Sequence, residues 1–554
     1  MNSTIVITDN YKNALESNLN IKLNTKQINF YNPILDNLVD KNECNNVIYK
    51  SKYFISELLE NTTKNTESQD TPYIKRNFNA KIINNYTKKY INKEIFIKVN
   101  PILDVVSYIL DEYDTKNTLF PNYISNYTSN YINNYNNTAY IDSFFSFIAS
   151  KMVETGKAPC FPLFYGTCSA LLDEYKYDIT EEYSKIKYNN MFQKNLDNIF
   201  TIDEIDIKNS DSEYDSDSES NSSTETESLE ELNKFTQHNI NNNELINIDN
   251  IEDILNSNNE FDNIDNNYVG ECRAGVVNEN LTKENLIGEN SIEETNLKSV
   301  LNIKSIDNSC DFSDIIDNND TFKYCILNNF PTQLLFMEKL EYTLDELIEN
   351  KEYNISTTEW KSILFQICFG LSIAQKHYKF VHNDLHSQNI MFVTTNDEYI
   401  FYEYNSKYFR IPTFGKIVKI IDYGRATFEF NKTIYFSSVF DDSGDAEGQY
   451  DYPENNSYDN CKHKPNYSFD LARLSTTIIE YFEKNNCIYK LLKGWLIDKY
   501  GKNLENHEDN FNLYIKIAKN ITNAVPKKQL TKVIFKEFLI TKNSINKKNY
   551  IFKY

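Results

Sequence analysis

Two polar motifs, each enclosed by apolar runs, constrain the fold of this chain more than any other feature. The first lies at residues 380–392 and reads FVHNDLHSQNIMF, and the second lies at residues 419–425 and reads KIIDYGR. The apolar runs predict short buried strands that hold the polar groups rigidly at the edge of a cleft. A helix is predicted directly upstream, over residues 357–376, because Ser356 and Glu359 have the spacing of a capping box.

Three side chains in these motifs are of the types that phosphoryl transfer requires. The reaction needs a carboxylate that orients the attacking hydroxyl group and accepts its proton, and two further oxygen ligands that hold Mg²⁺ against the nucleotide phosphates. Asp384 fits the first role, and Asn389 and Asp422 fit the second. A chance match on a surface loop would explain one motif, but it does not explain a second motif placed after a predicted strand.

The spacing of these residues resembles that of the protein-kinase superfamily. His382, Asp384 and Asn389 stand at the offsets of the catalytic-loop pattern H-R-D-L-x-x-x-N, and residues 422–424 read D-Y-G where D-F-G is expected. Within this superfamily the sequence resembles the haspin-type divergent kinases, and it also resembles kinase-like proteins of giant DNA viruses. The resemblance implies an α+β fold with a β-rich N-lobe and a mainly helical C-lobe, and it implies ATP and Mg²⁺ as cofactors.

The resemblance is weaker in the front half, where it implies a nucleotide-binding lysine. Residues 95–98 read IFIK and resemble the V-A-I-K strand, so that Lys98 would be a catalytic residue that grips the nucleotide phosphates. The sequence does not decide which acidic residue pairs with this lysine. Asp142 opens a predicted helix over residues 140–154, and Glu154 closes it. A helix-cap role for Asp142 fits the sequence as well as an ion pair with Lys98 does.

Two further elements follow from the resemblance. Asp470 resembles the buried aspartate that accepts backbone N–H groups of the catalytic loop, a structural role. The hinge that binds the adenine ring follows a predicted strand that ends at Met337, and it consists of Glu338, Lys339 and Leu340.

Three departures from the kinase pattern affect the expected chemistry. No glycine precedes Gly156, so the glycine-rich loop that covers the phosphates is absent and weaker nucleotide binding is expected. Asn383 replaces the arginine that captures an activation-loop phosphate, so switching by phosphorylation of that loop is not expected. Tyr423 replaces phenylalanine, and its ring still packs while its hydroxyl group needs a partner.

The negative charge of the chain is confined to one segment. The chain has a formal charge of −23, and residues 201–320 contain 30 acidic and 6 basic side chains. A segment rich in Asn, Asp and Ser cannot bury enough apolar surface to offset its ordering entropy, so a disordered acidic insertion is predicted in the N-lobe. The predicted organisation is an N-terminal extension (1–44), the first part of the N-lobe (45–179), the insertion (180–322), the end of the N-lobe with the hinge (323–340) and the C-lobe (341–554).

Composition narrows the range of partners and compartments. A pI of about 4.8 argues against direct nucleic-acid binding, and no apolar run is long enough to cross a bilayer. The N-terminus lacks the pattern of a signal peptide, and nine cysteines without a C-x-x-C pair indicate reduced thiols. These features predict a cytoplasmic protein, in the host cytoplasm or the virion if the chain is viral, and the insertion is a candidate for recruiting a partner.

The acceptor is predicted to be a protein hydroxyl group, with a preference for basic peptides. Six acidic residues and no basic residue occupy the segment that borders the acceptor groove of kinases, although a solvated loop explains them equally well. Two alternatives to an active serine/threonine kinase stay open, a catalytically weak pseudokinase that acts as a scaffold and a small-molecule phosphotransferase. The six residues are Asp441, Asp442, Asp445, Glu447, Asp451 and Glu454.

Overall fold

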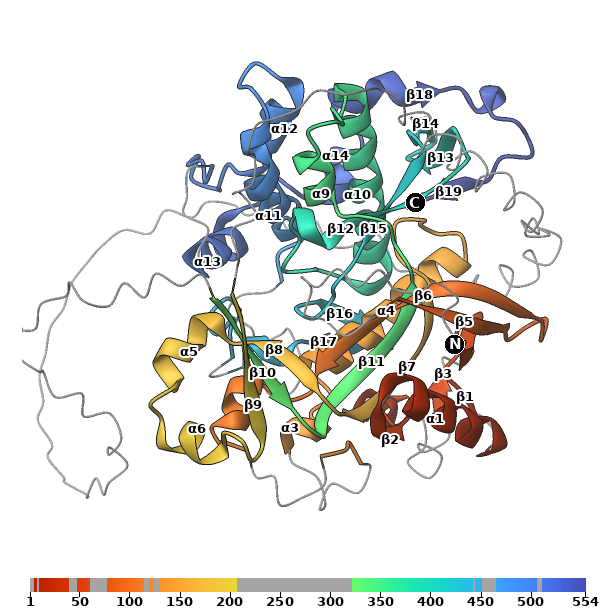
Figure 1. Ribbon diagram of the computed structural model, residues 1–554. Helices are drawn as coiled ribbons and strands as arrows, with labels where there is room; N and C mark the ends of the chain where they lie inside the picture. The colour runs from red at the N-terminus through yellow and green to blue at the C-terminus, as the bar shows by residue number, and fades with distance from the viewer. Residues whose placement is uncertain are drawn as a thin grey trace, which may run out of the picture. The chain divides into compact units, whose positions relative to one another are not determined.

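The structure is a computed structural model of the chain. It describes residues 4–6, 9–38, 47–59, 77–113, 119–122, 130–206, 321–441, 444–450, 465–505 and 511–554. Most of the predicted acidic insertion, the connection at residues 60–76, and Asp442, Asp451 and Glu454 lie outside these ranges. The described residues form a β-rich N-lobe and a mainly helical C-lobe, as the sequence predicts (Figure 1).

A six-stranded antiparallel sheet forms the N-lobe. Its strand order is β2-β7-β11-β6-β5-β4, and the central pair is β6 with β11. The predicted strands over residues 95–99 and 333–338 are therefore confirmed. The strands span β2 (Thr25–Asn29), β4 (Tyr53–Leu58), β5 (Asn77–Asn84), β6 (Tyr90–Pro101), β7 (Phe164–Leu172) and β11 (Phe330–Glu338).

Alternation along the central strands divides their side chains between two hydrophobic cores. In β11, Leu334 and Phe336 belong to a core shared with helix α1 (Asp9–Leu23), whereas Leu335 and Met337 belong to the core that contains helix α4 (Thr138–Glu154). The same alternation in β6 sends Ile97 to the α1 side. Its neighbour Lys98 therefore faces α4, which fixes the direction of the lysine.

Strand β7 begins later than the sequence predicts. The apolar run at residues 161–165 favours a strand from Phe161, but β7 begins at Phe164. Pro162 has no N–H group to donate to the β-ladder, and the Phe161 carbonyl group instead accepts a hydrogen bond from Lys419 Nζ at 2.9 Å.

The predicted start of the insertion at residue 180 is too early. Residues 175–206 fold onto the N-lobe, where three strands form an antiparallel sheet in the order β8-β10-β9. Buried side chains such as Ile186, Phe192 and Phe200 hold this part of the chain in the main core. The elements are β8 (Tyr175–Asp178), α5 (Thr180–Ile186), α6 (Asn190–Asn195), β9 (Phe200–Asp206) and β10 (Thr321–Leu327).

Helix starts in the C-lobe follow the predicted capping patterns. Thr343 and Glu346 form a complete capping box at the start of α9 (Leu344–Glu349). Ser356 caps α10 (Thr357–Tyr378), but the Glu359 carboxylate does not return to it. Glu359 forms a buried ion pair with Lys416 instead, because this side chain lies against strand β15 (Lys416–Ile420).

The remaining C-lobe elements lie around residues 380–392, the predicted catalytic segment. Strand β12 (Ile390–Thr394) pairs with β15. The segment between them forms a hairpin of β13 (Tyr399–Tyr404) with β14 (Lys407–Pro412), as its two runs of apolar and aromatic residues favour. Strand β19 (Ile551–Lys553) extends this hairpin as a parallel neighbour of β13, a pairing that no sequence pattern predicts. The other elements are α11 (Phe469–Ile478), α12 (Cys487–Trp495), α13 (Phe511–Asn520), α14 (Pro526–Gln529), and the pair β16 (Thr427–Phe430) with β17 (Thr433–Phe436).

The sequence predicts no membrane-spanning helix and only reduced cysteines. No helix among the described residues is long and apolar enough to cross a membrane. The five cysteines within the described ranges are free thiols, and only Cys487 among them is exposed.

Candidate active site

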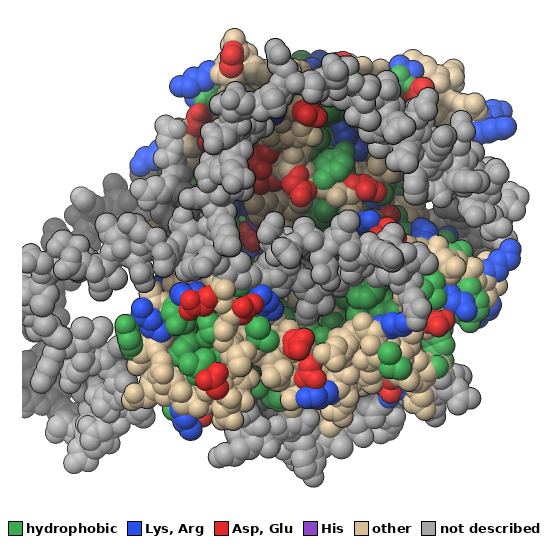
Figure 2. All heavy atoms as spheres, viewed as in Figure 1, with side chains coloured by type: hydrophobic (Ala, Val, Ile, Leu, Met, Phe, Trp, Pro, Cys, Tyr) green, Lys and Arg blue, Asp and Glu red, His purple; other side chains and the backbone are tan. Residues whose placement is uncertain are grey.

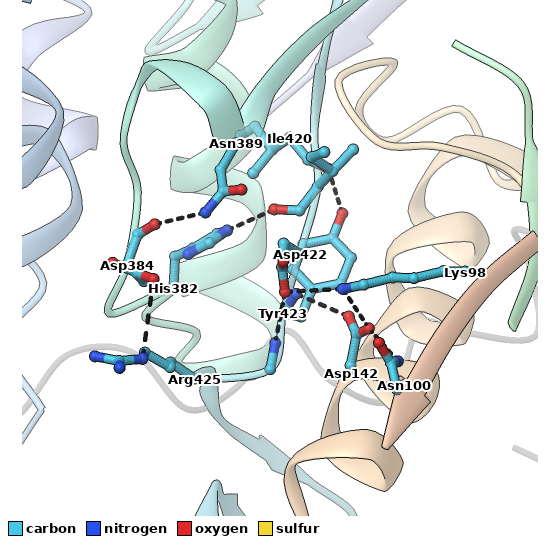
Figure 3. A network of polar contacts seen from close by, with 12 residues as sticks. Lys98, Asn100, Asp142, His382, Asp384, Asn389, Ile420, Asp422, Tyr423 and Arg425 are labelled. Carbon is cyan, nitrogen blue, oxygen red and sulfur yellow. Dashed lines mark hydrogen bonds and ion pairs between the residues drawn. The ribbon is translucent and has the colours of Figure 1, made fainter. Parts of the chain in front are cut away.

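Lys98 is the centre of a polar network that joins the two lobes. Its Nζ atom lies 2.8 Å from Asp142 Oδ2 and 2.9 Å from Asp422 Oδ1. Figure 3 shows Lys98 extending from its strand between these two carboxylates, with Asn100 beside Asp142. The structure thus brings together one predicted residue from β6, one from α4 and one from the segment after β15.

Asp142 is the acidic partner of Lys98, and it is not a helix cap. Asn137 caps α4, since its side chain accepts the N–H group of Ala139. Asp142 is buried one turn further along, where Oδ2 also accepts Asn100 Nδ2 and Oδ1 accepts the Tyr423 N–H group, both at 2.8 Å. The other candidate, Glu154, lies at the far end of the helix and bonds the Lys52 N–H group.

Charge pairing determines the protonation of this network. Burial lowers the pKa of Lys98, but Asp142 and Asp422 outweigh it and hold the pKa above its ordinary value. For Asp422, burial raises the pKa, but the Lys98 ammonium group lowers it by more. The pKa of Asp422 therefore lies below its ordinary value. Lys98 and Asp422 are therefore both charged at neutral pH. The side chain of Asp422 remains 45% exposed, which leaves it accessible to a ligand.

The catalytic segment orients Asn389 through its amide nitrogen. Nδ2 donates to the Asp384 carbonyl oxygen at 2.9 Å and lies 3.0 Å from His386 Nε2. Burial lowers the pKa of His386, so its ring is neutral and Nε2 accepts this hydrogen bond. With both amide protons engaged, Asn389 Oδ1 is the atom left to bind a cation.

The Asp384 carboxylate accepts a hydrogen bond at one oxygen and forms a longer ion pair at the other. Oδ1 accepts the Tyr514 hydroxyl group at 2.7 Å, and Oδ2 lies 3.9 Å from Arg425 Nε. Figure 3 shows Asp384 and Asn389 on one side of the site and Asp422, Lys98 and Asp142 on the other.

Asp470 anchors the backbone of the catalytic segment. It is fully buried and accepts the His382 N–H group at both oxygens, at 3.0 and 3.1 Å, and the Asn383 N–H group at 3.1 Å. This is the structural role that the kinase pattern implies. His382 itself lies 2.8 Å from the Ile421 carbonyl oxygen, and because burial lowers its pKa, the ring is neutral and donates this bond.

We expect Asp470→Ala to lower the free energy of unfolding by about 2–4 kcal/mol, because two buried N–H groups lose their acceptor. Burial raises the pKa of Asp470 to about 7, although the N–H groups of His382 and Asn383 oppose this shift. The folded state then binds the proton more tightly than the unfolded chain, so the stabilisation is full below about pH 4. It declines as the pH rises towards 7. Urea unfolding should show the gap between wild type and Asp470→Ala narrowing over this range, and a widening gap would contradict the assignment.

Asn383 replaces the usual arginine with hydrogen bonds that need no phosphate. Its Nδ2 atom donates to the Arg425 carbonyl oxygen at 3.0 Å and to Thr427 Oγ1 at 2.9 Å, and its Oδ1 atom accepts the Tyr450 hydroxyl group. The segment after Asp422 is thus tied to the catalytic loop directly. The Tyr423 hydroxyl group bonds the Ile420 carbonyl oxygen, which supplies the partner that its burial requires.

The predicted hinge connects β11 to α9. The Glu338 carboxylate pairs with Lys419 at 3.2 Å and accepts the Leu163 N–H group, so it faces the protein rather than a ligand. Lys339 pairs with Glu94 at 2.9 Å. The Leu340 N–H group has no hydrogen bond to another residue that the structure describes, which leaves it available to an adenine ring.

The sequence does not identify four residues that contact the site, namely Asn100, His386, Arg425 and Tyr514. Asn100 follows Lys98 by two positions and shares its face of the strand, a signal that alternation provides. His386 lies within the motif at residues 380–392, but the spacing of the motif does not indicate its contact with Asn389. Arg425 ends the motif at residues 419–425, but nothing in the motif indicates that it lies near Asp384. Tyr514 carries no local signal, because it reaches the site from a distant helix.

Known proteins match part of the chain. No family model matches. Serine/threonine-protein kinase haspin of Bos taurus is 32% identical over 120 residues, which are 22% of this chain and 15% of haspin. A protein of Acanthamoeba polyphaga mimivirus, named as a serine/threonine-protein kinase, is 31% identical over 166 residues, which are 25% of this chain and 41% of that protein. A crystal structure of a kinase domain aligns with 35% of this chain at 17% identity and a TM-score of 0.15.

These sequence similarities, together with the motifs and the fold, support the assignment of this chain to the protein-kinase-like superfamily as a divergent protein. The chain matches only about a sixth of the length of the two haspin relatives, from Bos taurus and Mus musculus.

Proposed function

We propose that this chain is an ATP-dependent protein serine/threonine kinase. The observation that carries the proposal is the position of Lys98, bonded to both Asp142 and Asp422, opposite Asp384 and Asn389. Apart from Asp142, which pairs with the lysine, four groups of the types that phosphoryl transfer requires thus come together from three separate parts of the chain (Figure 3).

Each residue has a separate task in this proposal. Lys98 binds the nucleotide phosphates, and Asp142 keeps its ammonium group charged and extended. Asp422 and Asn389 Oδ1 hold Mg²⁺, which neutralises charge on the phosphates; one exposed carboxylate and one amide oxygen suit this hard cation. Asp384 orients the acceptor hydroxyl group and takes its proton as the new O–P bond forms and the bond to the ADP oxygen breaks.

Magnesium-dependent nucleotide binding separates an active kinase from a scaffold. ATP at 100 times its dissociation constant should stabilise the folded chain by about 2.7 kcal/mol, seen as a rise in Tm that requires Mg²⁺. Asn389→Ala should lose most of the dependence on Mg²⁺, whereas Asn396→Ala, in an exposed turn, should retain it. Equal Tm values with and without nucleotide would favour the scaffold.

The class of acceptor is tested by transfer of labelled γ-phosphate. We expect label in a mixture of proteins and none in a mixture of small metabolites, and the reverse result would favour the small-molecule phosphotransferase.

A preference for basic peptides is supported by the exposed side chains of Asp441, Asp445 and Glu447. Figure 2 also shows acidic side chains gathered in a hollow on the part of the face where α9 lies. Equal turnover of acidic and basic peptide pools would contradict this preference.

A further inference from the structure

Among the residues that the structure describes, only Tyr514 donates a hydrogen bond of 3.5 Å or less to the Asp384 carboxylate. Its hydroxyl group lies 2.7 Å from Oδ1. The nearest cationic group, Arg425 Nε, is 3.9 Å from Oδ2, beyond hydrogen-bond distance. Among the described residues, the carboxylate thus accepts a hydrogen bond at Oδ1 only, and Oδ2 takes part in the longer ion pair.

The ring of Tyr514 is fixed by helix α11. Its centroid lies 5.9 Å from that of Phe469, and the Arg473 guanidinium carbon lies 4.9 Å from it. Both residues belong to the helix that carries Asp470. One helix therefore holds the catalytic segment twice, at the backbone through Asp470 and at the Asp384 side chain through Tyr514.

The contact leaves the acceptor position open. The side chain of Asp384 is 24% exposed, and its Oδ2 atom accepts no hydrogen bond within 3.5 Å from a described residue. Burial and the charge of Asp384 raise the pKa of Tyr514 to about 12, so its hydroxyl group stays protonated and acts as a donor. An acceptor hydroxyl group can then approach Oδ2 while Oδ1 is held.

We propose that Tyr514 is a positioning residue that fixes the Asp384 carboxylate so that Oδ2 faces the acceptor hydroxyl group. The inference rests on the proposed role of Asp384 in phosphoryl transfer. Without the hydroxyl group of Tyr514, the carboxylate samples other rotamers, and fewer encounters with bound acceptor are productive. ATP binding does not involve this contact.

Tyr514→Phe should therefore lower kcat about tenfold and leave KM for ATP within twofold of the wild-type value. The matched control is Tyr489→Phe, which removes a hydroxyl group that bonds the Glu505 carboxylate in the same lobe, and it should leave both constants unchanged. An unchanged kcat for Tyr514→Phe would overturn the inference. A raised kcat would overturn it as well, because the hydroxyl group would then be blocking the acceptor.

A thermal measurement tests the contact without turnover. Tyr514→Phe should lower Tm in the wild-type chain but not in an Asp384→Ala background, because the acceptor of its hydroxyl group is then absent. Coupling without any phosphate transfer would support the contact and count against the proposed kinase function. Phosphate transfer without coupling would overturn the role of Tyr514 and leave the kinase function standing.

Discussion

Asp384→Asn is expected to lower kcat for phosphoryl transfer by roughly 10²–10⁴-fold, the usual contribution of a general base. The amide cannot take the proton of the acceptor, but it keeps the shape of the side chain. Its oxygen can still accept the Tyr514 hydroxyl group, so the fold and the affinity for ATP should be retained. Steady-state transfer of γ-phosphate to protein, measured beside ATP titration by Tm, checks both statements.

The matched control is Asp397→Asn, an identical change at an exposed turn between β12 and β13. It should leave kcat unchanged. If Asp384→Asn transferred phosphate at the wild-type rate, Asp384 would not be the base, and the roles assigned to the catalytic segment would be wrong.

Lys98→Met should both destabilise the chain and abolish its response to ATP. The change leaves the buried Asp142 carboxylate without its cation, and losing one member of a buried ion pair costs about 3 kcal/mol, the low end of the usual range. Asn100 and the Tyr423 N–H group still donate to Asp142, which is why the low end applies. Urea unfolding measures the loss, and a Tm titration with ATP and Mg²⁺ measures the response.

Lys93→Met is the control for Lys98→Met, because Lys93 lies exposed on the same strand. It should change neither stability nor the ATP response. A stable Lys98→Met variant that still bound ATP would show that the network of Lys98, Asp142 and Asp422 is neither a structural centre nor a nucleotide site.

The sequence points to residues 380–392 as a candidate catalytic segment because the geometry of that segment is local. His382, Asp384 and Asn389 lie within one loop, whose offsets fix which side chains share a face. Asp470 was also recognised from its motif, although its three hydrogen bonds span nearly ninety residues. Both predictions depended on resemblance to a known pattern, and the structure supplies the contacts.

The contacts that sequence could not predict depend on distant packing. The pairing of Lys98 with Asp142 rather than Glu154 depends on which turn of α4 lies against β6, and spacing alone cannot distinguish the two ends of a helix. Tyr514 lies 130 positions from Asp384, with no motif around it. Composition also placed the boundary of the insertion too early, because scattered aromatic residues such as Phe192 and Phe200 still reach the core.

Turnover of ATP by the purified chain, compared with its Asp422→Asn variant, tests the central claim most directly. Lys98 binds Asp422 within the polar network, and the exposed carboxylate is available to a metal ion. We predict that the wild-type chain transfers γ-phosphate to protein when Mg²⁺ is present and that Asp422→Asn, while remaining folded, does not. Equal turnover by the two proteins, or none by the wild-type chain, would contradict the account.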